Sequence, residues 1–165
     1  MVIPTPDPIG PGQESVWDYP RPPRLEPIGR RIRIVHAGLV LVDTVRALRL
    51  LETSHPPSYY LPPADIAMAL LRPNNASSFC EWKGRAVYWD VLAGPRPLLA
   101  IGWSYPRPSP DFAALKDHIA FYAAPFDVCT VADEPVTPQP GGFYGGWITQ
   151  DVVGPFKGGP GSQFW

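Results

Sequence analysis

The alternation of apolar and polar residues predicts that this chain is built mainly from short β-strands. Ile32 and Ile34 alternate with polar Arg33, and β-branched residues continue beyond Gly38. Because side chains of a strand point alternately to its two faces, this pattern predicts a β-hairpin over 32–43. The same criteria, with Gly or Pro near the boundaries, predict further strands over 58–61, 85–91, 97–105, 118–122 and 128–131.

Two segments follow a helical spacing instead. Val45, Leu48 and Leu51 recur every three residues with arginines between them, which predicts a short helix over 44–52. A second short helix is predicted over 63–71, because a proline opens that segment and another proline follows shortly after it.

Proline and glycine limit how much of the chain can be helical. The 165 residues include 24 Pro and 15 Gly. Pro removes a backbone donor and Gly costs backbone entropy, so a mostly helical fold is excluded. The polar stretch 74–77 predicts a turn, and 110–115 predicts one helical turn. We therefore expect a mainly β fold with two short helices and long ordered loops.

The length permits one domain with a substantial core. Residues 1–29 begin as a mobile Pro- and Gly-rich lead-in and continue with Trp17 and Tyr19, which predict an extended arm docked on the body. Residues 30–134 carry the predicted strands and form the central domain. Residues 135–165 combine Gly and Pro with many aromatic side chains, which favours an ordered tail that wraps the sheet and can meet the arm.

Charge and cysteine usage narrow the partners and the compartment. The 14 Lys and Arg nearly balance the 15 Asp and Glu, which removes the electrostatic reason to expect nucleic acid or an anionic membrane as partner. No apolar run approaches the roughly 20 residues of a membrane span, and the N-terminus lacks the features of a signal peptide. We expect a cytoplasmic protein with free thiols at Cys80 and Cys129, no cofactor and an undetermined oligomeric state.

Four motifs in the central block resemble the domain of unknown function 427 family. They are LRLLETSHPPSYYLP at 48–62, CEWKGRAVYW at 80–89, WSYP at 103–106 and HIAFY at 118–122. The match in order and spacing covers roughly residues 30 to 135, and the two extensions look like those of longer, actinobacterial-type members.

The resemblance implies a fold of the β-tent (Mss4-like) class, with two antiparallel sheets that meet at an angle. Relatives in that class bind small ligands in an aromatic cage or reduce sulfoxides, and many hold a structural zinc through paired C-x-x-C motifs. This chain has neither C-x-x-C pair, so no such zinc is expected. The family has also been labelled a nucleotidyltransferase, but the chain shows no Gly-Ser motif with paired aspartates and no P-loop. Prolines within the Gly-rich stretch 153–161 remove amides that a phosphate cradle needs.

The motif from Cys80 to Gly84 is the sharpest chemical feature. If it opens a strand, Cys80 and Trp82 share one face while Glu81 and Lys83 share the other. A lysine in an apolar, aromatic setting loses solvation, its pKa falls, and it can act as base, nucleophile or anion anchor. The alternative is a surface lysine paired with a carboxylate.

Histidines supply the candidate acid–base groups. His55 titrates near neutrality and lies between Glu52 and two prolines, so it is a natural general base on a rigid loop. Alternatively, Glu52 and His55 only pin that loop through hydrogen bonds. His118 is either a second acid–base group or a core histidine bonded to a backbone carbonyl. His36, in the hairpin turn, is expected at the surface.

The remaining candidates are a cysteine, the potential metal ligands and the aromatic rings. Cys80 is either a nucleophile or, more commonly for such a residue, a buried structural thiol. Side chains at Glu52, His55, Cys80 and His118 are adequate metal ligands, but their scattered spacing is not a metal signature, and no metal is expected. The residues expected to bind the ligand are Cys80 and the rings of Tyr60, Trp82, Trp103 and Tyr105, with Trp89 in the core.

Two functional hypotheses follow. In the first, the chain is a small-molecule enzyme in which Lys83, with His55, Glu52 or His118, transfers protons on a ligand held against aromatic rings. In the second, it is a non-catalytic β-tent module that binds the ligand without turnover. Convergence of Lys83, His55 and Glu52 within hydrogen-bond reach in a concave pocket favours the enzyme, whereas a ring-lined pocket with these groups pointing to solvent favours the binding module. An interaction protein acting through its Pro-rich ends is a weaker third alternative.

Overall fold

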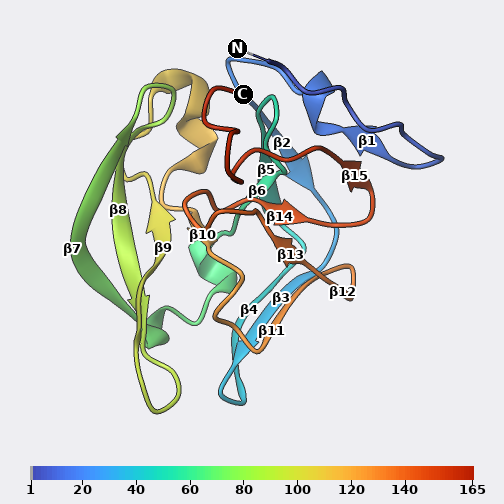
Figure 1. Cartoon of the computed structure of the whole chain (residues 1–165). Helices are drawn as coiled ribbons and strands as arrows, with labels where there is room; N and C mark the ends of the chain where they lie inside the picture. The colour runs from blue at the N-terminus through green and yellow to red at the C-terminus, as the bar shows by residue number, and fades with distance from the viewer. Residues whose placement is uncertain (1) are drawn as a thin grey trace.

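The computed structural model describes residues 2–165 and confirms a mainly β protein with several antiparallel sheets. One four-stranded sheet has the order β10-β9-β8-β7 and another has the order β12-β11-β3-β4; a three-stranded sheet has the order β2-β5-β6. Figure 1 shows the first sheet on one side of the molecule, the second below and opposite, and the C-terminal tail crossing between them.

The strands of these three sheets are β2 (Arg24–Ile28), β3 (Ile32–His36), β4 (Leu39–Thr44), β5 (Ala47–Leu51), β6 (Ser58–Tyr60), β7 (Leu71–Cys80), β8 (Gly84–Val91), β9 (Leu98–Ser104), β10 (Ile119–Phe121), β11 (Val128–Val131) and β12 (Glu134–Pro135). Two-residue strands β1 (Glu14–Ser15), β13 (Thr137–Pro138), β14 (Trp147–Ile148) and β15 (Val152–Val153) belong to the extensions. The helical elements are the 3₁₀ turns η1 (Val16–Asp18), η2 (Pro63–Asp65), η3 (Met68–Leu70) and η4 (Pro110–Leu115).

Alternation located most of the strands correctly. The hairpin predicted over 32–43 is β3 and β4, paired antiparallel with a bulge near Ile34. Ile32, Ile34 and Val42 are fully buried and pack with Ile119 and Phe121 of β10 in the main core. The predicted strands later in the chain correspond to β6, β8, β9, β10 and β11, and the helical turn over 110–115 is η4.

The helix predicted over 44–52 was wrong, because the segment forms strand β5. Its neighbours are β2 and β6, both antiparallel, and β2 was not predicted. Val45 is 58% exposed while Leu51 is fully buried, so the three-residue spacing did not mark one buried face. Pairing with β2 also places Glu26 opposite Arg49. Cross-strand partners from elsewhere in the chain outweighed a weak local preference.

Two further local predictions were also wrong. The segment 63–71 contains two separate 3₁₀ turns, η2 and η3, because Ile66 between them is extended and bridges to Val42 of β4. The stretch 74–77 is no turn between elements, since it lies inside the ten-residue strand β7. The pairing of β7 with β8 shifts register between Asn74 and Ser77, so the turn-forming residues produce a β-bulge.

The two extensions meet each other and cover the sheets. β1 pairs in parallel with β15, and Val16 and Tyr19 are buried beside Val152. In the tail, Trp147 is buried and its ring stacks on Tyr59 of β6 at 5.0 Å. The tail is therefore part of the folded body, and the division of the chain at residues 29 and 134 remains a prediction.

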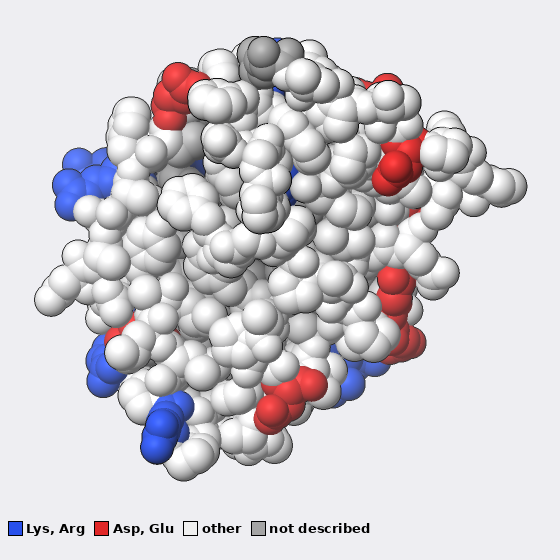
Figure 2. All heavy atoms as spheres, viewed as in Figure 1, with Lys and Arg blue, Asp and Glu red and all other residues white. Residues whose placement is uncertain are grey.

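Charged side chains are scattered over the surface. On the face in Figure 2, basic and acidic groups form small separate clusters, mostly toward the rim, and neither sign covers a large area among the residues described. No helix within residues 2–165 is long and apolar enough to cross a membrane.

Candidate functional site

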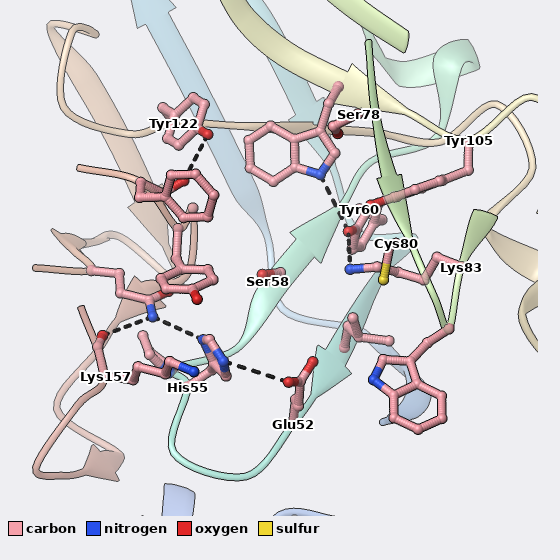
Figure 3. Close-up of a pocket in the computed structure, with 18 of the residues that line it drawn as sticks. Glu52, His55, Ser58, Tyr60, Ser78, Cys80, Lys83, Tyr105, Tyr122 and Lys157 are labelled. Atoms are coloured by element: carbon pink, nitrogen blue, oxygen red, sulfur yellow. Dashed lines mark hydrogen bonds and ion pairs between the residues drawn. The ribbon is translucent and has the colours of Figure 1, made fainter. Parts of the chain in front are cut away.

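A cavity of about 400 Å³ opens between strands β5 and β6, the β7–β8 hairpin and the C-terminal tail. Figure 3 shows polar side chains from these elements pointing toward one another across it. Eight of the predicted site residues line it: Glu52, His55, Tyr60, Cys80, Trp82, Lys83, Trp103 and Tyr105. Residues that are far apart in the sequence thus share one concave surface.

The hairpin between β7 and β8 brings Cys80 and Lys83 to the same cavity. The strand predicted to open at Cys80 was misplaced, because β7 ends at Cys80 and the next three residues form the turn. Strand alternation therefore does not apply to Trp82 and Lys83. Gly84, with φ of 102°, starts β8 in a conformation that other residues rarely adopt. The backbone N–H of Ser109 donates to the Lys83 carbonyl and fixes the turn.

Lys83 is held as an ammonium group. Its Nζ donates to the Tyr60 hydroxyl at 3.5 Å and lies 5.3 Å from the centre of the Tyr105 ring. Burial alone lowers the pKa of Lys83, but Tyr60, Tyr105, Cys80 and Glu52 together raise it above its ordinary value. The predicted fall in this pKa was wrong, because the oxygen- and sulfur-bearing neighbours outweigh desolvation. Lys83 suits an anion anchor better than a base.

His55 is neutral, and its hydrogen bonds define its tautomer. Gln139 uses its Oε1 to accept from the Gly146 N–H and its Nε2 to donate to the Lys157 carbonyl. The second proton on Gln139 Nε2 points to His55 Nδ1 at 2.9 Å, so Nδ1 accepts and Nε2 carries the ring proton.

The surroundings of His55 oppose a positive charge on its ring. Burial, and then the cations Lys157, Arg21 and Lys83, lower the pKa of His55 to about 3. In the neutral ring only Nδ1 has a lone pair that could accept a proton, and it already accepts the hydrogen bond from Gln139. The other nitrogen, Nε2, carries the proton and is a donor. His55 therefore does not fit the predicted role of general base, whereas the alternative of a hydrogen-bonding residue agrees with this geometry.

Glu52 is the carboxylate that this arrangement leaves available. Its Oε2 lies 3.5 Å from His55 Nε2 and 3.7 Å from Arg21 Nε, while Oε1 makes no hydrogen bond within residues 2–165. The side chain is 24% exposed, so a ligand can reach it. In Figure 3 Glu52 lies between His55 and Lys83. One carboxylate oxygen thus faces His55 and Arg21, and the other makes no hydrogen bond within residues 2–165.

Sequence reasoning missed the part of the site that comes from the tail. Gln139, Tyr144 and Lys157 line the same cavity, as does Tyr122 of the central block. Lys157 Nζ lies 5.5 Å from the centre of the Tyr144 ring and donates to the Trp165 carbonyl. The aromatic content of the tail was the available signal, but it did not indicate which strands the tail would cover.

His118 is not brought to the cavity. Its Nδ1 lies 3.2 Å from the Lys116 carbonyl, so the backbone contact of the structural alternative is present, but the half-buried side chain does not lie in the core. Cys129 is buried, and burial raises the pKa of its thiol to about 12. His36 is half-buried in its hairpin and contacts Phe126 rather than lying free at the surface.

Within residues 2–165, no group of three or more His, Cys, Asp or Glu side chains could hold a metal ion.

Residues 24–132 match the model of a family described as Domain of unknown function (DUF427), so the chain belongs to that family. A comparison with curated proteins gave no match. The matched segment includes Glu52, His55 and Lys83 but ends before Gln139 and Lys157. The tail therefore adds its part of the cavity from outside the family domain.

Proposed function

We propose that this DUF427 protein binds a small anionic ligand with a flat portion and transfers a proton on it. The observation that carries the proposal is the convergence of Glu52, His55 and Lys83 in one aromatic-lined cavity. Such convergence of titratable groups in a concave, ring-lined pocket is typical of active sites.

The cavity suits a flat anion because cations and rings line it together. Lys83 and Lys157 both reach the cavity, and each also lies over a tyrosine ring. Trp103 and Tyr122 pack on each other at 4.8 Å and offer a broad aromatic surface. A carboxylate or phosphate would contact the ammonium groups while a planar part of the ligand packs against these rings.

Three residues would divide the work of proton transfer. Oε1 of Glu52, which makes no hydrogen bond within residues 2–165, would take a proton from the ligand, so that one bond to hydrogen breaks and the electron pair stays on the ligand. Lys83 would stabilise the resulting negative charge. The Glu52 carboxyl would exchange its proton with solvent and then return a proton to another ligand atom. His55 is a positioning residue, because its Nε2–H faces the other oxygen of Glu52. No oxidant or reductant is needed.

Two alternatives remain. A non-catalytic β-tent module is favoured by the rings and by the locked, neutral state of His55. A nucleotidyltransferase, as the family label suggests, would use Lys83 and Lys157 on phosphates, but the sequence carries no motif that supports it.

A thermal-shift screen tests the binding part of the proposal. Carboxylates, phosphates and nucleotides would be tested on wild type, on Lys83→Met and on the control Lys116→Met, whose side chain is exposed and outside the cavity. We expect flat carboxylates to stabilise wild type and the control but not Lys83→Met. A ligand that shifts all three proteins equally would refute the role given to Lys83.

Turnover is tested separately by deuterium exchange. A ligand found in the screen would be incubated with the protein in D₂O, and incorporation of deuterium at carbon would be followed by NMR. We expect exchange with wild type and its loss in Glu52→Gln with binding retained. Binding without exchange in wild type would favour the non-catalytic module, and hydrolysis or transfer of a nucleotide would favour the family label.

A further inference from the structure

A second cavity, of about 320 Å³, lies beside the first and has a different character. Its floor comes from Leu99, Ala100 and Ile101 of β9 and from the chain that follows β10, and its roof comes from the tail. Of the described residues that line it, none is Asp, Glu, Lys, Arg or His.

The two cavities are separated by a single layer of residues. They share Tyr122, Gln139, Tyr144 and Gly145. The Tyr122 ring packs on Trp103, and the Tyr144 ring meets His55 edge-on at 4.7 Å, so both rings face the site already described. A ligand that occupied both cavities would have to pass between these shared residues.

The polar side chains in the layer shared by the two cavities already have hydrogen-bond partners within the protein. The Tyr122 hydroxyl donates to the Phe143 carbonyl, and the side-chain amide of Gln139 makes its bonds to His55, Gly146 and Lys157. On the open side, Leu99 is 64% exposed despite its place in a strand. The second cavity therefore offers mostly apolar surface, which favours hydrocarbon over polar groups.

We propose that the second cavity is the subsite for an apolar tail, and that the ligand is an amphiphile whose anionic head occupies the first cavity. The inference rests on the proposed function for the head and adds the class of ligand. Lys157, beside Tyr144, places a positive charge next to the wall where the head would give way to the tail. The volume corresponds to about ten waters of roughly 30 Å³ each, which is enough for a tail of several carbon atoms.

A homologous series of ligands measures the tail subsite directly. Benzoate supplies a flat anionic head, and 4-ethyl- to 4-hexylbenzoate add a tail of increasing length. Dissociation constants would be obtained by ligand-observed NMR titration, which detects weak binding. We expect affinity to rise by about fourfold per buried methylene group and to level off when the cavity is full.

Two variants address the cavity, and a third is the matched control. Leu99→Glu introduces a charge, and Ala124→Phe, at an exposed lining position, reduces the free volume. Val45→Glu makes the same change as Leu99→Glu at a position that is 58% exposed and lines neither cavity. The gain with chain length should vanish in the first two variants and persist in the control, with benzoate binding unchanged in all three.

The outcomes separate this inference from the proposed function. If benzoate binds through Lys83 and longer tails add no affinity, the tail subsite is refuted while the proposed function stands. A gain that persists in both Leu99→Glu and Ala124→Phe also refutes the subsite. If no benzoate binds, or if Lys83→Met binds the whole series as wild type does, the anionic head is refuted, and with it the proposed function.

Discussion

The side-chain amide of Gln139 donates a hydrogen bond of 2.9 Å to Nδ1 of His55. Because Gln139 is itself oriented by the Gly146 N–H and the Lys157 carbonyl, the tail determines which nitrogen of His55 carries the proton. The ring of His55 then presents Nε2–H to Glu52. A segment outside the family domain thus decides how a histidine inside it can act.

The first prediction is that His55 stays neutral, with its proton on Nε2, throughout the neutral and mildly acidic range. Its pKa of about 3 lies far below its usual value because of burial and of the cations Lys157, Arg21 and Lys83. Nitrogen-15 NMR of labelled histidine should show Nδ1 as the unprotonated nitrogen from neutral pH to pH 5. Titration of His55 near pH 6.5 would contradict the assignment.

Gln139→Glu is the variant that tests this assignment. A carboxylate beside Nδ1 accepts a hydrogen bond, so the ring proton should move to Nδ1 and the pKa of His55 should rise. The control is Gln150→Glu, at an exposed tail position that lines neither cavity. It should leave the nitrogen spectrum of His55 as in wild type.

The second prediction concerns stability in mild acid. The unfolded chain takes up a proton at His55 near pH 6.5, whereas the folded chain does so only near pH 3. Stability is therefore fully present above pH 6.5 and falls as the pH drops toward 3, by up to about 1.4 kcal/mol per pH unit. Urea unfolding at pH 7.0 and 5.0 should show a smaller loss in His55→Gln than in wild type. Equal losses would mean that His55 titrates alike in both states.

The third prediction concerns the contact of the tail with the cavity wall. A Cβ on Gly145 would lie 2.1 Å from the Trp103 ring, so Gly145→Ala must lift the tail or displace the ring. We expect a loss of about 1–3 kcal/mol in unfolding free energy and a change in tryptophan fluorescence. Gly159→Ala is the control, since a Cβ there has no neighbour within 4 Å. Equal effects of the two substitutions would show that the tail does not pack tightly on Trp103.

Local pattern was sufficient for strands whose sequence alternates and ends at Pro or Gly. The hairpin of β3 and β4 and the strands β8 and β9 are of this kind. Local pattern failed where pairing with a segment far away in the sequence determines the secondary structure. β5 is a strand because β2 and β6 flank it, and the Asn74–Ser77 bulge persists because β8 continues the pairing on both sides of it.

In the candidate site, too, residues within local motifs were predicted, whereas residues that depend on distant contacts were not. Glu52, His55 and Lys83 were found because they lie in motifs of the central block, and the structure places all three at one cavity. Gln139 and Lys157 have no motif of their own, and their role depends on where the tail crosses the sheet. The expected base character of His55 and the expected low pKa of Lys83 both failed because the decisive neighbours come from other segments.

The last prediction concerns the arm and strand β5. Arg49 bonds Glu26 of the neighbouring strand at 2.6 Å and Glu14 of the arm at 2.7 Å, and its side chain is only 11% exposed. Arg49→Met should cost about 1–3 kcal/mol of unfolding free energy, since two partly exposed carboxylates lose their partner. Arg46→Met, which removes a pair with Asp65 at a position 62% exposed, should cost less than Arg49→Met, because solvent screens the pair.

A double-mutant cycle on Arg49 then separates the two contacts. Glu14→Gln and Glu26→Gln would each be combined with Arg49→Met, and unfolding free energies would be measured by urea titration. We expect coupling with both partners, because the Arg49 guanidinium bridges the arm and the sheet. Coupling with Glu26 alone would mean that Glu14 does not hold the arm to β5, and that the pairing of β1 with β15 and the burial of Val16 dock it.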